Sequence, residues 1–252
     1  MRRDYAAAYR RLYERHWWWR AREAAVLAVL ERFVTKDRRG GDVLDVGCGD
    51  GLFFGPLARF GTVYGLEPDP ATSQQGNPYE ARIHRGGLDA DFRPGRGFGV
   101  LTMLDVLEHI EDDAAAAARV CDLLQPGGTA VLTVPAHGRL WTSHDTMNRH
   151  FRRYSAAALR DVLEGAGLIV ADVRFWFHWV AAAKLAVRLK ERLQGPSAET
   201  PRVPAAMVNR VLRAFSTAEL RGGRGLGLPF GSSLLAVARR PDPATPPAGP
   251  AA

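Results

Sequence analysis

Residues 43–51, which read VLDVGCGDG, predict a buried strand that ends in a tight turn before a helix. The apolar run stops where glycine takes every second position, at Gly47, Gly49 and Gly51. Glycine adopts positive φ and lets a ligand approach the backbone. A helix beginning near Leu52 would direct free N–H groups and a partial positive charge at the same place. The stretch therefore predicts a ligand-binding turn.

The spacing of these glycines indicates which ligand the turn binds. A dinucleotide fingerprint requires G-x-G-x-x-G, and leucine at position 52 occupies the place of the third glycine. An acidic residue followed by G-x-G-x-G resembles motif I of the class I S-adenosylmethionine (SAM) methyltransferases. The resemblance implies SAM as cofactor and S-adenosylhomocysteine as product. It implies that SAM is bound here by Asp45, Gly47, Cys48, Gly49 and Gly51.

An acidic residue follows the next apolar run, residues 62–66, which predicts a second strand. Ligands of an open parallel sheet bind beyond the carboxyl ends of its strands, so we expect Glu67 to lie beside the glycine turn. A carboxylate at this position can accept hydrogen bonds from both ribose hydroxyls. Glu67 and Pro68 match the second motif of the family.

A third, short strand is predicted at residues 81–84, and the turn after it contains a further acidic residue. In the methyltransferase family, an acidic residue at this turn binds the adenine amino group. The match implies this role for Asp89, with Leu88 and Ala90 as flanking contacts, while Asp91 remains an alternative.

The segment LDVLEH follows a continuous apolar run that predicts a strand at residues 98–104. It resembles a segment of the ubiquinone and menaquinone methyltransferases, which implies that His109 lies near the acceptor and that SAM contacts Leu104, Asp105 and Val106. Asp105, Glu108 and His109 also form a D-x-x-E-H pattern. A related E-x-x-E-H pattern binds a divalent metal in some quinone and small-RNA methyltransferases. We expect no metal site, although the pattern leaves one open.

The amino-terminal region predicts one or two helices over residues 4–36, interrupted by the cluster HWWWR. Three consecutive tryptophans cannot all face one core, so we expect at least one to contact a ligand, a partner or the lid of a cleft. A surface helix that folds over the edge of the sheet would also use them and is the alternative. The cluster resembles a segment that folds over the cofactor in small-molecule methyltransferases. This implies that Trp18 and Arg20 lie near the methionine end of SAM, where the guanidinium can bind its carboxylate.

Two regions after the predicted fifth strand, residues 129–134, are candidates for acceptor binding. In the loop that begins at Pro135, His144 beside Asp145 could act as a general base. Residues 175–193 predict a basic amphipathic helix that could roof an apolar acceptor pocket or lie on an anionic membrane surface. Packing of this helix on the sheet is the alternative.

Composition agrees with a single soluble domain with appendages. The chain has 252 residues, 46% of them hydrophobic, and a formal charge of +7 that is mostly arginine. Two cysteines support neither a disulfide framework nor a cysteine metal site, and no apolar run is long enough to span a bilayer. We expect a cytoplasmic protein, with contact to the inner face of the membrane through residues 175–193 as an option.

We therefore expect an α/β fold, a Rossmann-like seven-stranded, mostly parallel sheet with helices on both faces and an antiparallel last strand. The expected divisions are a helical lid at 1–40, the core at 41–175, a helical insertion at 176–231, the last strand at 232–240 and a disordered tail at 241–252. The expected function is methyl transfer from SAM to oxygen or carbon of a small-molecule or lipid-like acceptor. The alternatives are an RNA methyltransferase and a non-catalytic partner protein. No RNA-binding module is recognisable, so nucleic acid is not the expected partner, and the sequence leaves the oligomeric state open.

Overall fold

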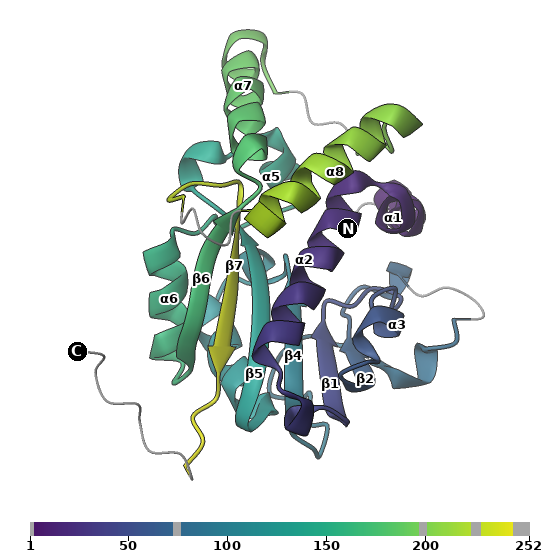
Figure 1. Ribbon diagram of the computed structural model, residues 1–252, viewed down its shortest axis with the longest axis vertical. Helices are drawn as coiled ribbons and strands as arrows, with labels where there is room; N and C mark the ends of the chain where they lie inside the picture. Colours follow the sequence, from purple (N-terminus) through teal and green to yellow (C-terminus); the bar gives the residue numbers. More distant parts are fainter. Residues whose placement is uncertain (1–2, 73–76, 197–200, 223–227, 244–252) are drawn as a thin grey trace.

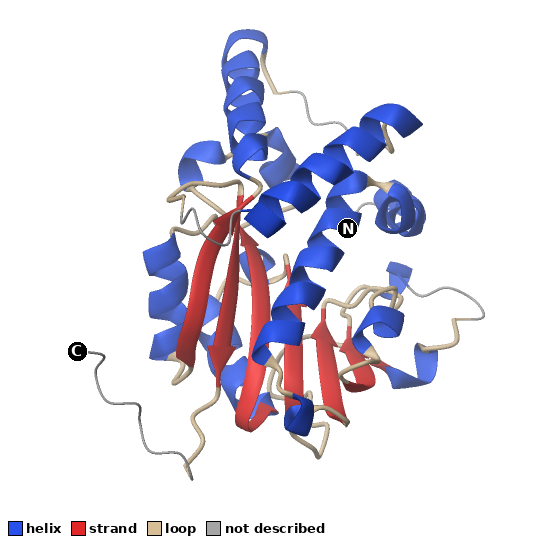
Figure 2. Cartoon of the chain, in the orientation of Figure 1, coloured by secondary structure: helices blue, strands red, loops and turns tan. Residues whose placement is uncertain are grey.

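The computed structural model describes residues 3–72, 77–196, 201–222 and 228–243. These residues form a seven-stranded sheet with helices on both faces (Figures 1 and 2). The strand order is β3-β2-β1-β4-β5-β7-β6, and only β7 runs antiparallel to its neighbours. The strands are β1 (Gly41–Val46), β2 (Gly61–Leu66), β3 (Ile83–His84), β4 (Phe98–Leu104), β5 (Leu124–Pro135), β6 (Ile169–Trp176) and β7 (Ser233–Arg239). This confirms the predicted fold class, with the last strand inserted beside β5.

The first strand lies between β2 and β4 and is buried on both faces, which explains its continuous apolar run. Its one acidic residue, Asp45, pairs in register with Thr102 of β4. The Thr102 hydroxyl donates a hydrogen bond of 2.6 Å to the Asp45 carboxylate, so this buried polar group has a partner.

Two apolar clusters cover the two faces of the sheet. On one face, Leu101 and Leu132 pack with residues of α4 and α6, and on the other, Val43 and Val131 pack with residues of α2, which crosses the sheet in Figure 1. The helices are α1 (Arg3–Arg15), α2 (Trp17–Phe33), α3 (Phe54–Leu57), α4 (Asp113–Leu123), α5 (Ser143–Met147), α6 (Ala156–Gly165), α7 (His178–Gln194) and α8 (Ala206–Gly222). The parallel strands point toward the end of the molecule where α7 and α8 lie.

Side chains cap two helices on one face of the sheet. Ser155 caps α6 by accepting a hydrogen bond from the Ala158 amide. The cap of α4 is Asp112, whose carboxylate accepts from the Ala115 amide. The carboxylate of the next residue, Asp113, accepts a hydrogen bond from the Tyr154 hydroxyl.

The carboxy-terminal insertion holds the junction of the first two helices. Asn209 of α8 accepts a hydrogen bond from the Trp17 amide at 2.8 Å and donates one to the Arg15 carbonyl at 2.7 Å. The Trp17 ring packs against Trp179 of α7, with centroids 5.0 Å apart. The insertion is therefore tied to the amino-terminal helices. The predicted tail beyond residue 243 and part of the predicted glycine-rich loop, residues 223–227, lie outside the described residues.

Candidate cofactor and acceptor site

The glycine turn after β1 has a backbone that only glycine adopts without strain. Gly47, Gly49 and Gly51 have φ of 72°, 60° and 80°. A Cβ on Gly47 would lie 2.4 Å from Cγ2 of Val106, in the segment that follows β4. The first glycine is therefore required both by its conformation and by the close approach of two strand ends.

Glu67 at the end of β2 is fixed against this turn. One carboxylate oxygen accepts a hydrogen bond from the Gly49 amide at 2.9 Å, and the other accepts from the Asp69 amide at the same distance. The side chain is buried, at 8% exposure. The predicted juxtaposition of Glu67 and the glycine turn is thus present, and backbone amides hold the carboxylate in place.

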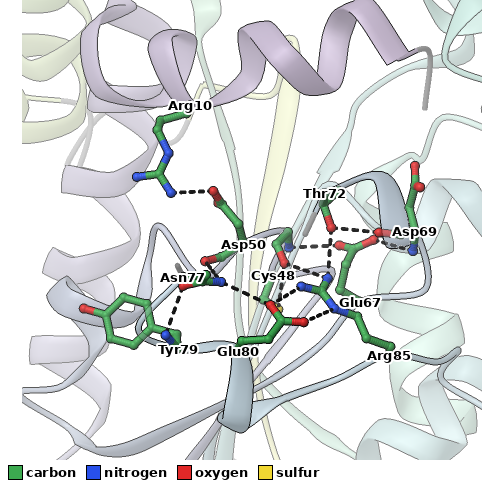
Figure 3. A network of polar contacts seen from close by, with 11 residues as sticks. Arg10, Cys48, Asp50, Glu67, Asp69, Thr72, Asn77, Tyr79, Glu80 and Arg85 are labelled. Atoms are coloured by element: carbon green, nitrogen blue, oxygen red, sulfur yellow. Dashed lines mark hydrogen bonds and ion pairs between the residues drawn. The ribbon is translucent and has the colours of Figure 1, made fainter. Parts of the chain in front are cut away.

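A network of polar contacts braces the outer side of the turn (Figure 3). Arg85 pairs with Glu80 at 2.7 Å and donates a hydrogen bond of 3.0 Å to the Thr72 hydroxyl. Arg10 of α1 pairs with Asp50 in the turn at 2.6 Å. The Arg10–Asp50 pair fastens α1 over the glycine turn, so the first helix covers this part of the site.

A cavity lies between the glycine turn and the first two helices. It encloses about 420 Å³, counting the part that is open to solvent. Tyr9 and Tyr13 project into its lining from α1. The complete lining is Tyr9, Tyr13, Trp19, Arg22, Glu23, Asp45, Gly47, Cys48, Leu52, Phe53 and Leu104.

An ion pair between Arg22 of α2 and Asp105, just after β4, joins the two sides of the cavity. The Arg22 guanidinium also lies 4.9 Å from the ring centre of Trp18. Burial alone would lower the pKa of Arg22, but the facing Asp105 carboxylate more than offsets this and raises it. Asp105 itself has a φ of 56°, rare for a residue with a side chain.

The cation in the cavity is therefore Arg22, whereas the sequence comparison assigned this place to Arg20. Positions 20 and 22 lie about 200° apart around a helix, so they cannot face the same side. Arg20 instead pairs with Glu23 at 2.6 Å. Likewise Trp19 lines the cavity, and Trp18 stacks on Phe177 and supports Arg22 from outside.

The buried acidic residue of β1 has unusual proton affinity. Burial raises the pKa of Asp45 to about 7, against the hydrogen bond from Thr102 and the charge of Arg22, which favour the ionised form. Burial also raises the pKa of the Cys48 thiol, so Cys48 lines the cavity as a neutral group.

The residues expected to bind adenine do not line this cavity. Asp89 is exposed, and its carboxylate accepts a hydrogen bond from the Asp91 amide at 2.9 Å. Leu88 is half-buried against the core, and Pro68 and Ala90 are exposed. Their roles remain predictions.

On the acceptor side, Asp145 is fully buried in a network with Arg153 and His150. Its carboxylate lies 2.8 Å from Arg153 Nε and 3.0 Å from His150 Nδ1. Although burial alone would raise the pKa of Asp145, these partners hold it well below its usual range. His144 instead contacts the Asn148 side chain at 2.9 Å. The histidine that Asp145 orients is therefore His150, not its sequence neighbour His144.

His150 joins a group that we call the acceptor cluster: Glu108, His109 and His150. Each offers one ligand atom, and these atoms lie within 4.8 Å of one another. Glu108 is 1% exposed, and its Oε2 has no hydrogen-bond partner. Burial, and then the Asp105 charge, raise the pKa of Glu108 well above its usual value. The donor set could bind a divalent cation. The sequence placed His150 in the loop expected to admit the acceptor but assigned it no role in the site, because a loop conformation brings it to Glu108 and His109.

Comparison with known proteins identifies the family. Residues 18–173 match the model of a methyltransferase domain, so the chain belongs to the methyltransferase domain family. It is 31% identical over 184 residues to a probable S-adenosylmethionine-dependent methyltransferase of Mycolicibacterium smegmatis, covering 70% of this chain and 69% of the relative. It is 33% identical over 128 residues to a ubiquinone biosynthesis O-methyltransferase of Ruegeria pomeroyi, covering 46% of this chain and 45% of the relative. The chain thus spans less than half of that second relative.

Solved structures agree on the fold. The chain described as the putative methyltransferase in a complex with the Haloferax volcanii Trm112 methyltransferase activator matches with a TM-score of 0.59 and 21% identity, covering 94% of this chain and 95% of the other. Phosphoethanolamine N-methyltransferase 2 of Haemonchus contortus, in complex with SAM, matches with a TM-score of 0.55 and 21% identity, covering 86% of this chain and 52% of the other. The protein is a SAM-dependent methyltransferase, and SAM is its cofactor. An RNA acceptor and a non-catalytic role are not favoured.

Proposed function

We propose that this enzyme transfers the methyl group of SAM to oxygen or carbon of a small-molecule or lipid-like acceptor by in-line displacement. The observation that carries the proposal is the segment after β4. Asp105 reaches the cavity through its ion pair with Arg22, and Glu108 and His109 follow within one turn and meet His150. The cavity at the glycine turn and a cluster of acid–base side chains therefore share one short segment.

The residues around the cavity fit SAM. The Glu67 carboxylate can accept hydrogen bonds from the ribose hydroxyls at the edge of the glycine turn. Arg22 and Asp105 carry opposite charges, which match the carboxylate and the amine of the methionine portion. These two residues pair with each other in the structure, so binding would exchange their mutual contact for contacts to SAM. Asp89, with Leu88 and Ala90, is proposed to contact adenine.

The chemistry requires little from the protein beyond alignment and exclusion of water. Bound SAM supplies an electrophilic methyl group, so the chain must hold the acceptor atom in line with it. Where the acceptor is a hydroxyl, the proposed proton acceptors are His150, oriented by Asp145, and His109. Burial and the proximity of His150 lower the pKa of His109, which keeps its imidazole neutral and able to accept a proton.

The relatives support an acceptor that is a small molecule. Several are named ubiquinone biosynthesis O-methyltransferases, although the alignments cover only part of their length. The predicted pair His144 and Asp145 is replaced in this proposal by Asp145 and His150, because these two side chains are in contact.

Product mass tests the proposal. The purified enzyme is incubated with SAM carrying a labelled methyl group and, in separate reactions, with RNA or with a panel of catechols, phenols and alkylated phenols, and the products are analysed by mass spectrometry. We expect a labelled methylated product whose yield falls at least about a hundredfold in His150→Gln, as for loss of a general base, and little in His144→Gln. The two variants share a loop, so they form a matched pair. Equal losses in both, or products only from RNA, would contradict it.

The orphan carboxylate oxygen of Glu108 favours a second arrangement, in which a divalent cation bound by the acceptor cluster holds the acceptor oxygens. The Asp145 carboxylate on His150 Nδ1 is the kind of contact that orients a metal-bound imidazole. Titration with Mn²⁺ followed by electron paramagnetic resonance tests this directly. Saturable binding that Glu108→Gln removes would support the cation. Activity unchanged by chelators, with no Mn²⁺ bound, would leave only the proton-transfer role.

A further inference from the structure

Helix α7 exposes an apolar stripe that no other described element covers. Leu185, Leu189 and Leu193 are 53%, 59% and 78% exposed. Their spacing of four residues places them on one side of the helix. Arg188 and Arg192 flank this stripe on one side and Lys190 on the other, at helical angles of about 60° to 100° from Leu189. Such a face, apolar and bordered by cations, is typical of helices that lie in a membrane interface.

Helix α8 repeats this arrangement. Met207, Val211 and Phe215 follow the same four-residue spacing and are 66%, 57% and 57% exposed. The opposite side of α8 is used for packing, through Asn209 against the α1–α2 junction and Ser216 against Trp179. The Phe215 ring also contacts Trp179 of α7, with centroids 6.1 Å apart, yet more than half of each of the three side chains stays exposed. The exposed side is therefore a second apolar stripe and not the result of a poorly packed helix.

The outward-facing charges on both helices have one sign. Each helix contains one acidic residue, and both acidic side chains are engaged within the protein. Glu191 accepts a hydrogen bond of 2.5 Å from the Ser143 hydroxyl, and Glu219 accepts one of 2.7 Å from the His178 amide. Among the described residues, no hydrogen bond or ion pair engages four basic side chains, those of Lys190, Arg192, Arg210 and Arg213. Lys190, Arg192 and Arg210 lie beside the apolar stripes and form a positive border, whereas Arg213 lies about 200° from Val211 around α8 and faces away from the stripe.

We propose that the exposed faces of α7 and α8 dock the enzyme on an anionic lipid bilayer. The two helices lie beyond the carboxyl ends of the parallel strands, which is the end that carries the glycine turn (Figure 1). In the described part of the chain no helix is long and apolar enough to cross a membrane, so the contact is interfacial. Docking at this end presents the site to an acceptor that resides in the lipid. The proposal depends on the surface alone and is independent of the acceptor chemistry proposed above.

Co-sedimentation of the full-length enzyme with vesicles tests the docking. One set contains phosphatidylcholine alone, and the other contains phosphatidylcholine with about one third phosphatidylglycerol. We expect binding to the anionic set that weakens with added salt, and at least about tenfold weaker binding to the neutral set. Equal recovery with both sets, or no binding to either, would overturn the proposal.

Surface variants identify the contact. The triple variant Leu185→Ser, Leu189→Ser and Leu193→Ser, or the triple variant Met207→Ser, Val211→Ser and Phe215→Ser, should weaken binding about tenfold or more, because the apolar insertion is lost. Lys190→Gln, Arg192→Gln and Arg210→Gln should cost about fivefold for each charge at the bilayer surface. The matched control removes three charges that precede the amino ends of the strands: Lys36, Arg59 and Arg93. If the control lost as much binding, net charge and not this surface would be responsible, which overturns the proposal.

The alternative to a bilayer is that a second copy of the chain covers these stripes. Light scattering of the lipid-free enzyme, wild type and the two serine variants, tests this. A monomer in all three agrees with the bilayer proposal. A dimer that both serine variants dissociate would assign the stripes to self-association and overturn it. SAM binding of the variants, measured by calorimetry, verifies that they remain folded.

Discussion

The cofactor side and the acceptor side of the site are held in place by different means. On the cofactor side, the geometry is that of the main chain: three glycines with positive φ, and a carboxylate held by two backbone amides. On the acceptor side, side chains hold other side chains. Asp145 orients His150 and is itself paired with Arg153, from a loop and a helix that have no regular pairing with the sheet.

This difference predicts different failures. A side chain added to the main-chain turn displaces the ligand itself, while the fold can remain. A change in the acceptor network leaves a buried charge without its partner, so stability is affected before chemistry is. The two sides therefore separate into one that responds in ligand binding and one that responds in folding free energy.

The largest effect is expected from Gly47→Val. The new Cβ would lie 2.4 Å from Val106 Cγ2, at a φ of 72° that valine does not adopt, so the turn must rearrange. We expect SAM binding to fall by a factor of about a thousand or more, as for loss of several charge-assisted hydrogen bonds, measured by calorimetry. Gly41→Val, at the start of the strand that precedes the turn and with no atom within 4 Å of an added Cβ, is the control. Near-normal SAM affinity in Gly47→Val would show that SAM binding does not depend on the main-chain conformation of the turn.

On the acceptor side, the corresponding change is Arg153→Met. It leaves the fully buried Asp145 without its cation, which should cost about 3 to 5 kcal/mol of unfolding free energy. Urea denaturation measures this. Arg160→Met, which breaks a half-exposed pair with Glu164, is the control and should cost at most about 1 kcal/mol. Similar small losses in both variants would show that Asp145 does not depend on Arg153.

The same difference explains what could be predicted from the sequence. The glycine turn, Glu67 and the strand order follow from local patterns, because main-chain conformations and strand ends are encoded by contiguous residues. Trp18 and Arg20 were assigned one or two positions away from Trp19 and Arg22, since a motif match does not fix which face of the helix points inward. His150 lies in the loop that was expected to admit the acceptor, but it was assigned no role in the site. Its contact with Asp145 depends on a loop conformation that no sequence periodicity records.

The pH dependence of the unfolding free energy tests the cofactor side in the absence of a ligand. The pKa of Asp45 is about 7 in the folded protein and about 3.9 in an unfolded chain. Between these values only the folded state retains the proton, so stability falls as pH rises from 4 to 7 and levels off above 7. The loss attributable to Asp45 is about 4 kcal/mol at most. Asp45→Asn should remove much of it in urea denaturation at pH 5 and 8, whereas Asp42→Asn, on the same strand, should not. If the unfolding free energy of Asp45→Asn depended on pH as that of the wild type does, a group other than Asp45 would bind the proton.

The smallest effect tests whether the carboxylate of Glu67 acts on the ligand or only on the turn. Glu67→Gln has one acceptor oxygen in place of two, so it cannot accept from the Gly49 and Asp69 amides together and still bind a ribose. Loss of a charge-assisted hydrogen bond should weaken SAM binding about tenfold to a hundredfold. Glu80→Gln removes a charge from the same network, where Glu80 pairs with Arg85 at the outer side of the turn. If Glu80→Gln weakens SAM binding as much as Glu67→Gln does, both side chains act by shaping the turn. SAM is then bound on the cofactor side by main-chain groups alone. If only Glu67→Gln weakens SAM binding, one side chain on that side contributes directly to the ligand.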